Sequence, residues 1–450
     1  MEFMFMGLFI LAEIVLTVLT FIRFKEKSDW LKNRMLVRII ETVLLTAIVL
    51  MPFTYMKWRF LAAMAVLIIR LLIAGIVWLA KRKKVTGIKR KPGTVISCFI
   101  SVVIVSISMT PAFIFTNYHG LETTGKYTVS QTSAILVDKD RIDSFENDGS
   151  FREVPVHFYY PQTEGGNFPL VVFSHGAFGY HESNYSTYAE LASNGYVVAA
   201  LDHPHHAIFT KDTDGKTVIV DSKFMNDAMG INSIEDEEMI FSVTQSWMKL
   251  RTDDENFVLD TIKDAKDTAK LSDAWHTDNA NTVLSVISKT DAEKIGLLGH
   301  SLGGASSTAV GRQRSDIDAV VVLDGTMLGE RTEIKDGKHV YISEAYPVPV
   351  LDFTKESDYN EREQYKDENG YAYVNEYVIK NAVDGKTVVF KNAGHMDFTD
   401  LPLISPSIAS MLGHGDVNSE EMMNTVNAIV LNWFDYYLKN EGTLDIQARY

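Results

Sequence analysis

The hydrophobic positions of the chain follow two unlike patterns. Four long apolar stretches occupy the first part of the chain, at about residues 3–22, 37–55, 60–80 and 95–115. Each of them approaches the ~20 residues that an α-helix needs to cross the hydrocarbon core of a bilayer. A cleaved signal peptide resembles the first stretch but does not account for the other three. The pattern therefore predicts a transmembrane region of four helices over residues 1–116.

Beyond residue 116 the apolar runs are short, and glycine, asparagine, aspartate and proline separate them. Strand-like and helix-like runs then alternate, from a strand predicted at 170–173 to an amphipathic helix predicted at 420–438. This alternation is typical of a mostly parallel sheet with helices on both faces, so we expect an α/β fold for residues 117–450. An acidic, helix-rich stretch at about 222–290 interrupts the alternation, and we expect either a lid or a solvated helical face there.

The charge balance separates the same two parts of the chain. Residues 1–116 contain 16 lysines and arginines against 5 aspartates and glutamates, a net charge of +11. The remaining residues contain 27 against 53, a net charge of −26. This acidic balance argues against nucleic-acid binding, which requires clustered lysine and arginine. Cys98 is the single cysteine, which excludes an internal disulfide framework and a cysteine-based structural zinc site.

Basic residues concentrate in two of the loops that join the predicted membrane helices. The loops at 23–34 and 81–91 hold 5 and 7 lysines and arginines, and the loop between the second and third helices holds 2. Strongly basic loops stay in the cytoplasm, which directs the domain after residue 116 to the other side. We therefore expect a multi-pass protein, with a bacterial cell membrane as the setting and an extracytoplasmic domain. Glu13, Glu41 and Arg70 lie in or near the spans, where charges usually pair, so we expect a Glu–Arg contact between helices.

Residues 299–303 read Gly-His-Ser-Leu-Gly, which is a G-x-S-x-G motif. A strand-like run at 295–298 leads directly into it, and small residues suited to a closely packed helix follow. In this context the serine occupies a strained turn between strand and helix, with its hydroxyl exposed above the sheet. The two glycines are needed because the tight turn leaves no room for side chains. The motif predicts Ser301 as a catalytic nucleophile.

A serine hydroxyl requires a base, and in this setting the chain order is serine, acid, histidine. His395 follows the strand predicted at 387–390, and we expect it to be the base because it lies at a strand end. His414, in a glycine-flanked loop, is the other histidine in this region. Two aspartates, Asp324 and Asp352, end successive strands, and either could orient the imidazole. Their spacing alone does not separate them.

An oxyanion hole requires two backbone N–H groups. We expect the first from Leu302, which follows the nucleophile, and the second from the glycine-containing turn at 174–179. Within that turn Ala177 is the expected donor, and Phe178 is the alternative. The side chains and backbone next to these groups are the expected substrate-binding residues, namely His175, Gly176, Phe178 and His300.

Residues 202–206 read Asp-His-Pro-His-His and follow another predicted strand. Imidazoles suit zinc, so a metal cluster is one interpretation of this loop. Residues so close in sequence rarely converge on one ion, and no fourth ligand is evident. We therefore interpret the loop as one that lines the cleft, and we expect neither a metal nor an organic cofactor.

Several segments together resemble the platelet-activating factor acetylhydrolases of the plasma and isoform II type and their bacterial relatives. These segments are Arg152–Val156 with Tyr159–Pro161, Phe173–Gly176, Leu191–Ala200, Gly299–Gly304, Leu323–Asp324 and Gly394–Asp400. The resemblance covers roughly residues 125–440 and implies the α/β-hydrolase fold. It also implies Asp324 rather than Asp352 as the acid beside Ser301 and His395, and the two amides chosen above as the oxyanion hole. It implies nothing for the predicted membrane helices.

These features together predict a membrane-anchored serine esterase that hydrolyses carboxylic esters through an acyl-enzyme. The anchoring and the resemblance favour a phospholipid with a short or oxidised sn-2 acyl group. The expected partners are therefore a lipid or small-molecule ester and the bilayer, with no nucleic acid. A general carboxylesterase or an acylglycerol lipase is the alternative with the same chemistry. A catalytically silent membrane-bound binding module is the alternative of another class, and the complete set of catalytic residue types argues against it.

Overall fold

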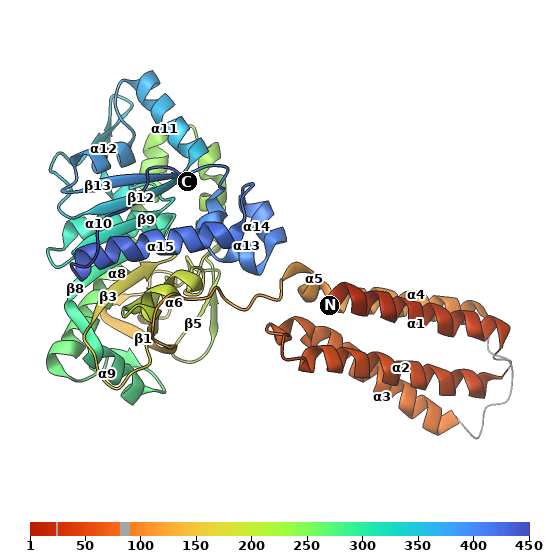
Figure 1. Cartoon of the computed structure of the whole chain (residues 1–450). Coiled ribbons are helices and arrows are strands. Elements are labelled where there is room, and N and C mark those ends of the chain that lie inside the picture. The colour runs from red at the N-terminus through yellow and green to blue at the C-terminus, as the bar shows by residue number, and fades with distance from the viewer. Residues whose placement is uncertain (24–25, 82–90) are drawn as a thin grey trace. The chain divides into compact units, whose positions relative to one another are not determined.

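The structure is a computed structural model, and it describes residues 1–23, 26–81 and 91–450. The remaining residues of the two basic loops, 24–25 and 82–90, lie outside the described residues. The chain forms two compact units (Figure 1). One consists of Met1–Gly120 and Leu403–Ala409, and the other of Leu121–Pro402 and Ser410–Tyr450. Each unit is described by itself below.

The first unit is helical over the residues that the structure describes. Its N-terminal elements are α1 (Glu2–Ile22), α2 (Lys27–Leu50), η1 (Lys57–Phe60), α3 (Leu61–Lys81), α4 (Lys91–Ser108) and α5 (Thr110–Ile114). Two helical stretches, Glu2–Ile22 and Lys57–Lys81, are long and apolar enough to cross a membrane. The span predicted at 95–115 is divided between α4 and α5, because Pro111 cannot continue a helix in its interior. Over the described residues, length and composition support a membrane span for two of the four predicted helices.

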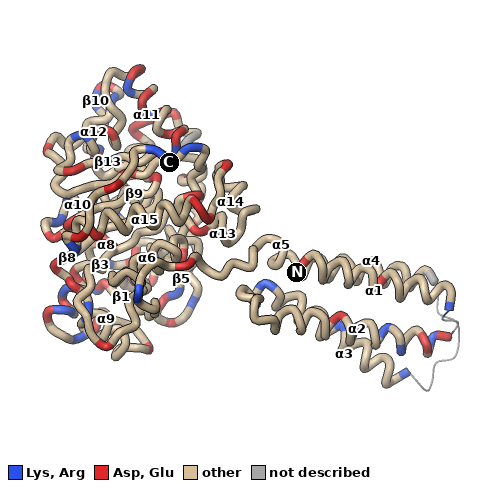
Figure 2. Tube along the Cα trace, viewed as in Figure 1, with Lys and Arg blue, Asp and Glu red and all other residues tan. Residues whose placement is uncertain are grey.

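Charged side chains lie inside this unit, and large apolar side chains lie on its outside. Glu13, Arg38 and Glu41 are all at most 2% exposed. Arg38 Nη1 lies 2.7 Å from a Glu13 oxygen and 2.9 Å from a Glu41 oxygen, and Arg70 contacts both glutamates. The expected Glu–Arg contact between helices is thus present, and Arg38 extends it. Figure 2 shows few charged residues along these helices and many over the α/β domain.

The second unit is built on a nine-stranded sheet with the order β13-β12-β9-β8-β3-β4-β2-β1-β7. The strand pairs from β13 to β4 are parallel, and β2, β1 and β7 extend the sheet with antiparallel pairs. Valine, alanine and leucine fill β4 and β9, which are buried throughout, as central strands covered on both faces require. The strand bounds are β1 (Val129–Ile142), β2 (Phe151–Pro161), β3 (Phe168–Ser174), β4 (Val197–Leu201), β7 (Trp275–His276), β8 (Thr290–His300), β9 (Ala319–Leu323), β12 (Val350–Lys355) and β13 (Gly385–Phe390).

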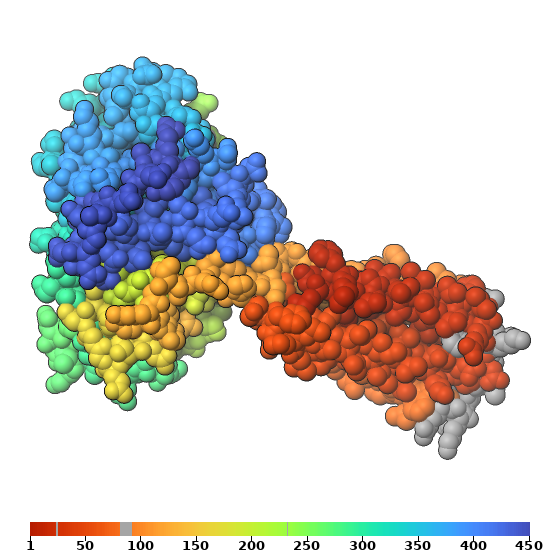
Figure 3. Space-filling model, viewed as in Figure 1, coloured from red at the N-terminus to blue at the C-terminus, as the bar shows by residue number. Residues whose placement is uncertain are grey.

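Helices cover both faces of this sheet. One apolar core includes residues of α8 (Glu237–Thr268), α9 (Ala280–Lys289), α10 (Leu302–Gln313) and α12 (Val374–Asn381). The other includes residues of α6 (Tyr185–Ser193) and α15 (Ser419–Leu438), and Figure 1 shows these two helices side by side. The last residues of the chain, darkest blue in Figure 3, lie on the visible face, where Tyr450 N donates to Val389 O. The α/β class predicted from the sequence is confirmed.

Shorter elements complete the unit. Two hairpins lie outside the large sheet, β5 (Phe209–Lys211) with β6 (Thr217–Ile219) and β10 (Arg331–Lys335) with β11 (Lys338–Tyr341). Its remaining helices are α7 (Ser222–Gly230), η2 (Ile231–Ser233), η3 (Leu328–Glu330), α11 (Glu356–Asn369) and η4 (His395–Phe398). The helices α13 (Leu401–Ile404) and α14 (Pro406–Leu412) include Leu403–Ala409, which belong to the first unit. In the stretch where we expected a lid or a solvated face, α8 buries Val258, Leu259 and Ile262 in the core. This helix is part of the domain interior, and the lid stays a prediction for α7.

Candidate active site

Ser301 lies in the tight turn between β8 and α10. Its backbone has φ +53° and ψ −122°, a conformation that costs energy for any residue with a side chain. The flanking glycines are required sterically. A Cβ on Gly303 would lie 1.9 Å from Ser174 O, and a Cβ on Gly299 would lie 2.3 Å from the carbonyl carbon of Gly303. The strand–turn–helix setting predicted for Ser301 is therefore present.

Asp324 and His395 meet at the carboxyl edge of the sheet. Asp324 directly follows β9 and His395 begins η4 after β13, so the edge brings them together from different segments. His395 Nδ1 lies 2.7 Å from Asp324 Oδ2, and the amide of Lys355 donates to Asp324 Oδ1 over 3.2 Å. Burial acts to raise the pKa of Asp324, but the hydrogen bond and charge of His395, with Arg362 and the Lys355 amide, hold it below its usual value. The carboxylate is therefore ionised at neutral pH.

The second candidate acid lies in a different environment. Asp352 is fully buried, and Arg362 Nη1 and Asn375 Nδ2 donate to its two oxygens over 2.9 and 3.0 Å. Burial raises its pKa to about 6 against the opposing charge of Arg362. The other histidine of this region, His414, pairs with Asp397. The structure thus brings together Asp324 and His395, and it gives the other two candidates separate partners.

The surroundings of Ser301 connect it to the His395 loop and to the turn after β3. The ring of His300 lies 4.6 Å from that of His395, centroid to centroid, and a Cβ on Gly176 would lie 3.2 Å from Ser301 Cβ. Over the described residues the Ser301 hydroxyl has no hydrogen-bond partner. Catalytic hydrogen bonds of this kind often form only when substrate is bound.

Two backbone amides near Ser301 are free to bind an oxyanion. Over the described residues the N–H groups of Ala177 and Leu302 donate to no protein acceptor. The alternative donor is already used, because Phe178 N donates to His206 O over 3.0 Å. Ala177 packs against an apolar cluster that includes Leu302, and its neighbour Gly176 lies next to Ser301.

Two of the predicted substrate-binding residues are too deeply buried for that role. His175 is 0% exposed, its Nδ1 lies 2.6 Å from Gly176 O, and its Nε2 accepts the amide of His203 over 3.1 Å. His300 is 4% exposed, and burial together with His395 lowers its pKa to about 3. Both imidazoles therefore support the turns around Ser301. Phe178, with φ +63°, is half-buried, and with Gly176 it remains beside the candidate site.

Sequence reasoning missed an arginine that holds the turn after β3. Arg251, on α8, is 0% exposed and donates to the carbonyl oxygens of His175 and Gly176. Burial lowers its pKa to about 9. These bonds orient the turn through its carbonyl groups and leave the Ala177 amide free. Helical periodicity could have indicated that Arg251 is buried, since it falls on the same face of the helix as the buried Trp247.

A second set of serine, histidine and aspartate lies behind the same turn. Ser174 Oγ is 2.9 Å from His203 Nε2, and His203 Nδ1 is 3.0 Å from Asp254 Oδ2. All three side chains are 0% exposed. Arg152 Nη2 donates to Asp254 over 2.7 Å, and Ser306 Oγ lies 3.0 Å from Ser174 Oγ. We call Ser174, His203 and Asp254 the buried set.

The histidines of loop 202–206 point to different partners. His203 belongs to the buried set, His205 stacks on Phe145 at 4.3 Å, and His206 stacks on Phe224 at 3.7 Å, all centroid to centroid. They do not converge on one point. Most of the loop supports the turn after β3 from behind.

Comparisons with known proteins identify the family of this chain. A family model described as platelet-activating factor acetylhydrolase, isoform II, matches residues 148–445. Platelet-activating factor acetylhydrolases of Cavia porcellus and Bos taurus are 24% and 22% identical to the chain over 313 and 300 residues, which is 65% and 62% of the chain. The chain spans 63% and 60% of the length of these two relatives. The helices α1 to α5 lie outside the family match.

A solved structure also resembles the chain. Ferulic acid esterase from Streptomyces cinnamoneus aligns with a TM-score of 0.51 and 21% identity, and the alignment covers 72% of this chain and 95% of the esterase. At this level of identity the likeness concerns the fold. It confirms the α/β-hydrolase architecture predicted from the sequence.

Proposed function

This chain belongs to the platelet-activating factor acetylhydrolase, isoform II family, and we propose that it is a serine esterase that hydrolyses carboxylic esters. The observation that carries the proposal is the 2.7 Å contact of His395 with Asp324, at the sheet edge where Ser301 occupies a strained turn. The two free amides, of Ala177 and Leu302, supply the remaining requirement of acyl transfer.

In the proposed acylation step Ser301 Oγ attacks the ester carbonyl carbon, and His395 Nε2 takes the hydroxyl proton. The ionised Asp324 holds the ring by its Nδ1 and stabilises the imidazolium. The carbonyl oxygen, now negative, accepts hydrogen bonds from the amides of Ala177 and Leu302. When the tetrahedral intermediate collapses, the ester C–O bond breaks and the leaving alkoxide takes the proton from His395.

In the proposed deacylation step water replaces the departed alcohol. His395 removes a proton from the water as it attacks the acyl carbon, and then returns that proton to Ser301 Oγ as the acyl bond breaks. The products are a carboxylic acid and an alcohol. The chain's own residues provide every proton transfer in this scheme.

The surroundings of the two amides favour an acyl group of modest size. A small apolar cluster contains Leu302 together with Phe224 of α7 and Trp247 of α8, and Ala177 and Phe178 pack against it. An acyl chain bound with its carbonyl at the amides would extend along this cluster. We infer that the substrate is a short-acyl or phospholipid-type ester. This inference rests on the apolar wall and on the family.

We also infer that helices of the first unit anchor the domain in a membrane. The support is the inverted distribution of side chains, in which Glu13, Arg38 and Glu41 are buried and residues such as Leu11 and Ile14 are exposed. A soluble helical bundle has the opposite distribution. On this proposal the basic loops are cytoplasmic and the catalytic domain is extracytoplasmic.

Ester hydrolysis by the 450-residue chain tests the proposal directly. Phosphocholine lipids with acetyl, hexanoyl or palmitoyl groups at sn-2 would be compared with p-nitrophenyl esters and triacylglycerols. We expect the acetyl and hexanoyl phospholipids to be cleaved fastest. Preference for p-nitrophenyl esters would favour a general carboxylesterase, and preference for triacylglycerols would favour a lipase.

A catalytically silent binding module is the rival from a different class. A folded chain that fails both to hydrolyse every ester and to react with a fluorophosphonate probe would support that rival and contradict the proposal. Both assays would be run with the protein in lipid, so that a cover formed by α7 cannot produce a false negative.

A further inference from the structure

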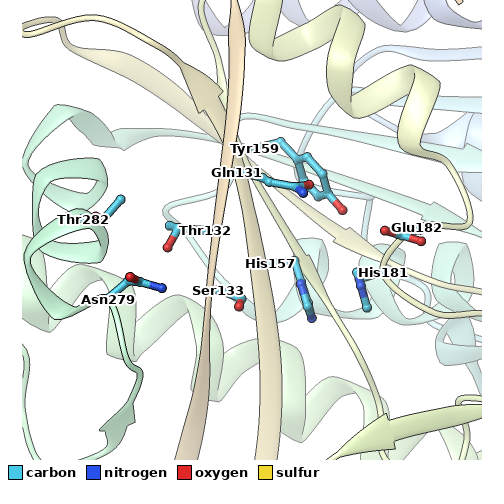
Figure 4. Close-up of a pocket in the computed structure, with 9 residues that line it drawn as sticks. All are labelled: Gln131, Thr132, Ser133, His157, Tyr159, His181, Glu182, Asn279 and Thr282. Carbon is cyan, nitrogen blue, oxygen red and sulfur yellow. The ribbon is translucent and has the colours of Figure 1, made fainter. Parts of the chain in front are cut away.

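Three side chains converge beside a pocket outside the candidate active site. His157 lies on β2, His181 lies in the segment between β3 and α6, and Asp202 directly follows β4. The pocket has a volume of about 510 Å³ and is lined by both histidines and by Glu182. Figure 4 shows the two imidazoles close together and pointing the same way, with Glu182 nearby.

The distances among these three side chains suit a shared ligand. His181 Nδ1 lies 2.8 Å from Asp202 Oδ2, and His157 Nε2 lies 3.7 Å from the same oxygen. One donor atom from each of the three residues lies within 4.8 Å of the other two. Ligand atoms that each lie ~2.0–2.2 Å from a tetrahedral cation are separated by similar distances.

The buried carboxylate of this cluster has no arginine partner over the described residues. Asp202 is 2% exposed, and its ion-pair partners over the described residues are the two histidines. Two other buried aspartates each have an arginine, because Arg152 pairs with Asp254 and Arg362 pairs with Asp352. A compensating charge stabilises a buried carboxylate, and a divalent cation would supply one here.

The two imidazole rings of the cluster lie against each other. The rings of His157 and His181 are stacked at 3.3 Å with an interplanar angle of 2°. Binding of one cation by both rings would require them to leave this stacked arrangement by rotation about their Cβ–Cγ torsions.

We propose that His157, His181 and Asp202 form a binding site for one divalent transition-metal cation of the zinc class. The ligand atoms are Nε2 of His157, Nδ1 of His181 and Oδ2 of Asp202. In the metal-bound form the ring N–H of His181 lies on Nε2, and Nδ1 contacts the cation in place of its present hydrogen bond with Asp202. Water from the pocket completes a tetrahedral set. Two imidazoles and one carboxylate favour Zn²⁺ over Mg²⁺ or Ca²⁺, which prefer oxygen ligands alone.

A cation in this position would join three parts of the fold. The amide of His181 already donates to Asp202 Oδ1 over 2.7 Å, and the amide of Asp202 donates to Pro155 O on β2 over 2.9 Å. His181 also lies at the end of the segment that begins with the turn carrying Ala177. The metal would therefore fasten this segment to β2 and β4 and raise the thermal stability of the domain. The proposal does not depend on ester hydrolysis.

Zinc binding by the 450-residue chain tests this proposal. After chelator treatment, titration with Zn²⁺ against a chromogenic chelator should give one site per chain, and Zn²⁺ should raise the melting temperature. The variants His157→Ala and Asp202→Asn should each weaken binding about tenfold or more and abolish the thermal shift. Co²⁺ should give the visible d–d absorption of a four-coordinate site in the wild type and lose it in both variants.

His276→Ala is the matched control, because His276 is an exposed histidine on β7 and lies outside the cluster. It should bind Zn²⁺ like the wild type. Circular dichroism of the chelated proteins would establish that each variant is folded. Absence of a Zn²⁺ site in the wild type, or binding that both cluster variants retain, would overturn the proposal.

Discussion

Two sets of serine, histidine and aspartate lie in the α/β domain, one in its interior and one at the carboxyl edge of the sheet. The buried set has the better hydrogen bonds, since both of its contacts, of 2.9 and 3.0 Å, are formed. None of its three side chains is exposed. Arg152 donates to the aspartate, and the Ser306 hydroxyl is hydrogen-bonded to the Ser174 hydroxyl, so the buried set has a structural role.

The set at the sheet edge has the opposite properties. Ser301 has a strained backbone and a hydroxyl without a protein partner over the described residues, and the His395 side chain is 34% exposed. Free amides of Ala177 and Leu302 lie near it. The comparison teaches that the order of residue types and their hydrogen bonds do not identify a nucleophile. The exposure of the histidine side chain, the strained backbone of the serine and the free amides nearby distinguish the two sets.

Replacing each of the two serines by alanine should give the largest difference in esterase activity between the two sets. Ser301→Ala should lower kcat for ester hydrolysis by about 10⁴-fold or more and abolish fluorophosphonate labelling, because no nucleophile remains. Ser174→Ala should keep labelling and change kcat by less than about tenfold. Mass spectrometry of the labelled peptide provides the measurement. Labelling at Ser174 in the wild type would contradict the assignment of the buried set.

Replacing each aspartate by asparagine should distinguish the role of Asp324 from that of Asp352. Asp324→Asn should lower kcat by about 10³- to 10⁴-fold with little loss of stability, because His395 loses the group that sets its tautomer. Asp352→Asn should remove the nearer of the two carboxylates that pair with the buried Arg362 and leave Glu376 at 3.5 Å, which costs on the order of 3 kcal/mol in the free energy of unfolding. Steady-state kinetics and thermal unfolding of both variants provide the test. A larger kinetic effect from Asp352→Asn would reverse the assignment.

Arg251 supports the turn that carries Ala177, next to Ser301. Arg251→Lys should lower kcat by about 10- to 100-fold with a smaller change in KM, since a lysine cannot reproduce both carbonyl contacts. Arg314→Lys, on an arginine whose partners are Asp260 and Asp316, is the control. Equal effects of the two substitutions on kcat would remove the positioning role.

Glu255 should affect stability and leave activity nearly unchanged. It is fully buried, its oxygens accept from Ser306 and Ser307, and burial raises its pKa to about 8. Because the folded pKa exceeds the unfolded one, the stability that this proton contributes is full below about pH 4.5 and is lost as pH rises through about 8. Glu255→Gln should therefore gain on the order of 3 kcal/mol relative to the wild type between about pH 5 and pH 9.

Thermal unfolding of the wild type and of Glu255→Gln at both pH values measures this difference. Esterase activity at each pH serves as the control, because the substitution should not alter it by more than about twofold. Parallel pH profiles of stability for the two proteins would show that Glu255 is ionised throughout.

The strands and the turn around Ser301 could be predicted from the sequence because local signals specify them. Uninterrupted apolar runs marked β3, β4 and β9, and the two glycines of the motif leave only one backbone path at Ser301. His395 could be chosen because it follows a predicted strand. These features depend on residues close together in the chain.

The parts that could not be predicted depend on distant residues. Asp324 directly follows the last residue of β9, whereas Asp352 lies within β12 opposite Val322, because β12 continues to Lys355. The expectation that both aspartates end strands therefore holds for Asp324 and is wrong for Asp352. The buried face of α8 looked solvated because its acidic residue Asp254 finds its partner, Arg152, 102 residues away. Length and hydropathy likewise gave four spans where the described helices support two.

The ion cluster among α1, α2 and α3 has a consequence for how the protein is made. Glu13 emerges from the ribosome long before Arg38 and Arg70, and alone in hydrocarbon each such charge costs about 2.5–3.5 kcal/mol or more. The four charges cancel only when all three helices are present. If these helices enter a bilayer as proposed, α1 must wait beside the insertion machinery for its partners. Truncation of the nascent chain before Arg70 would then leave the earlier helices poorly retained in the membrane.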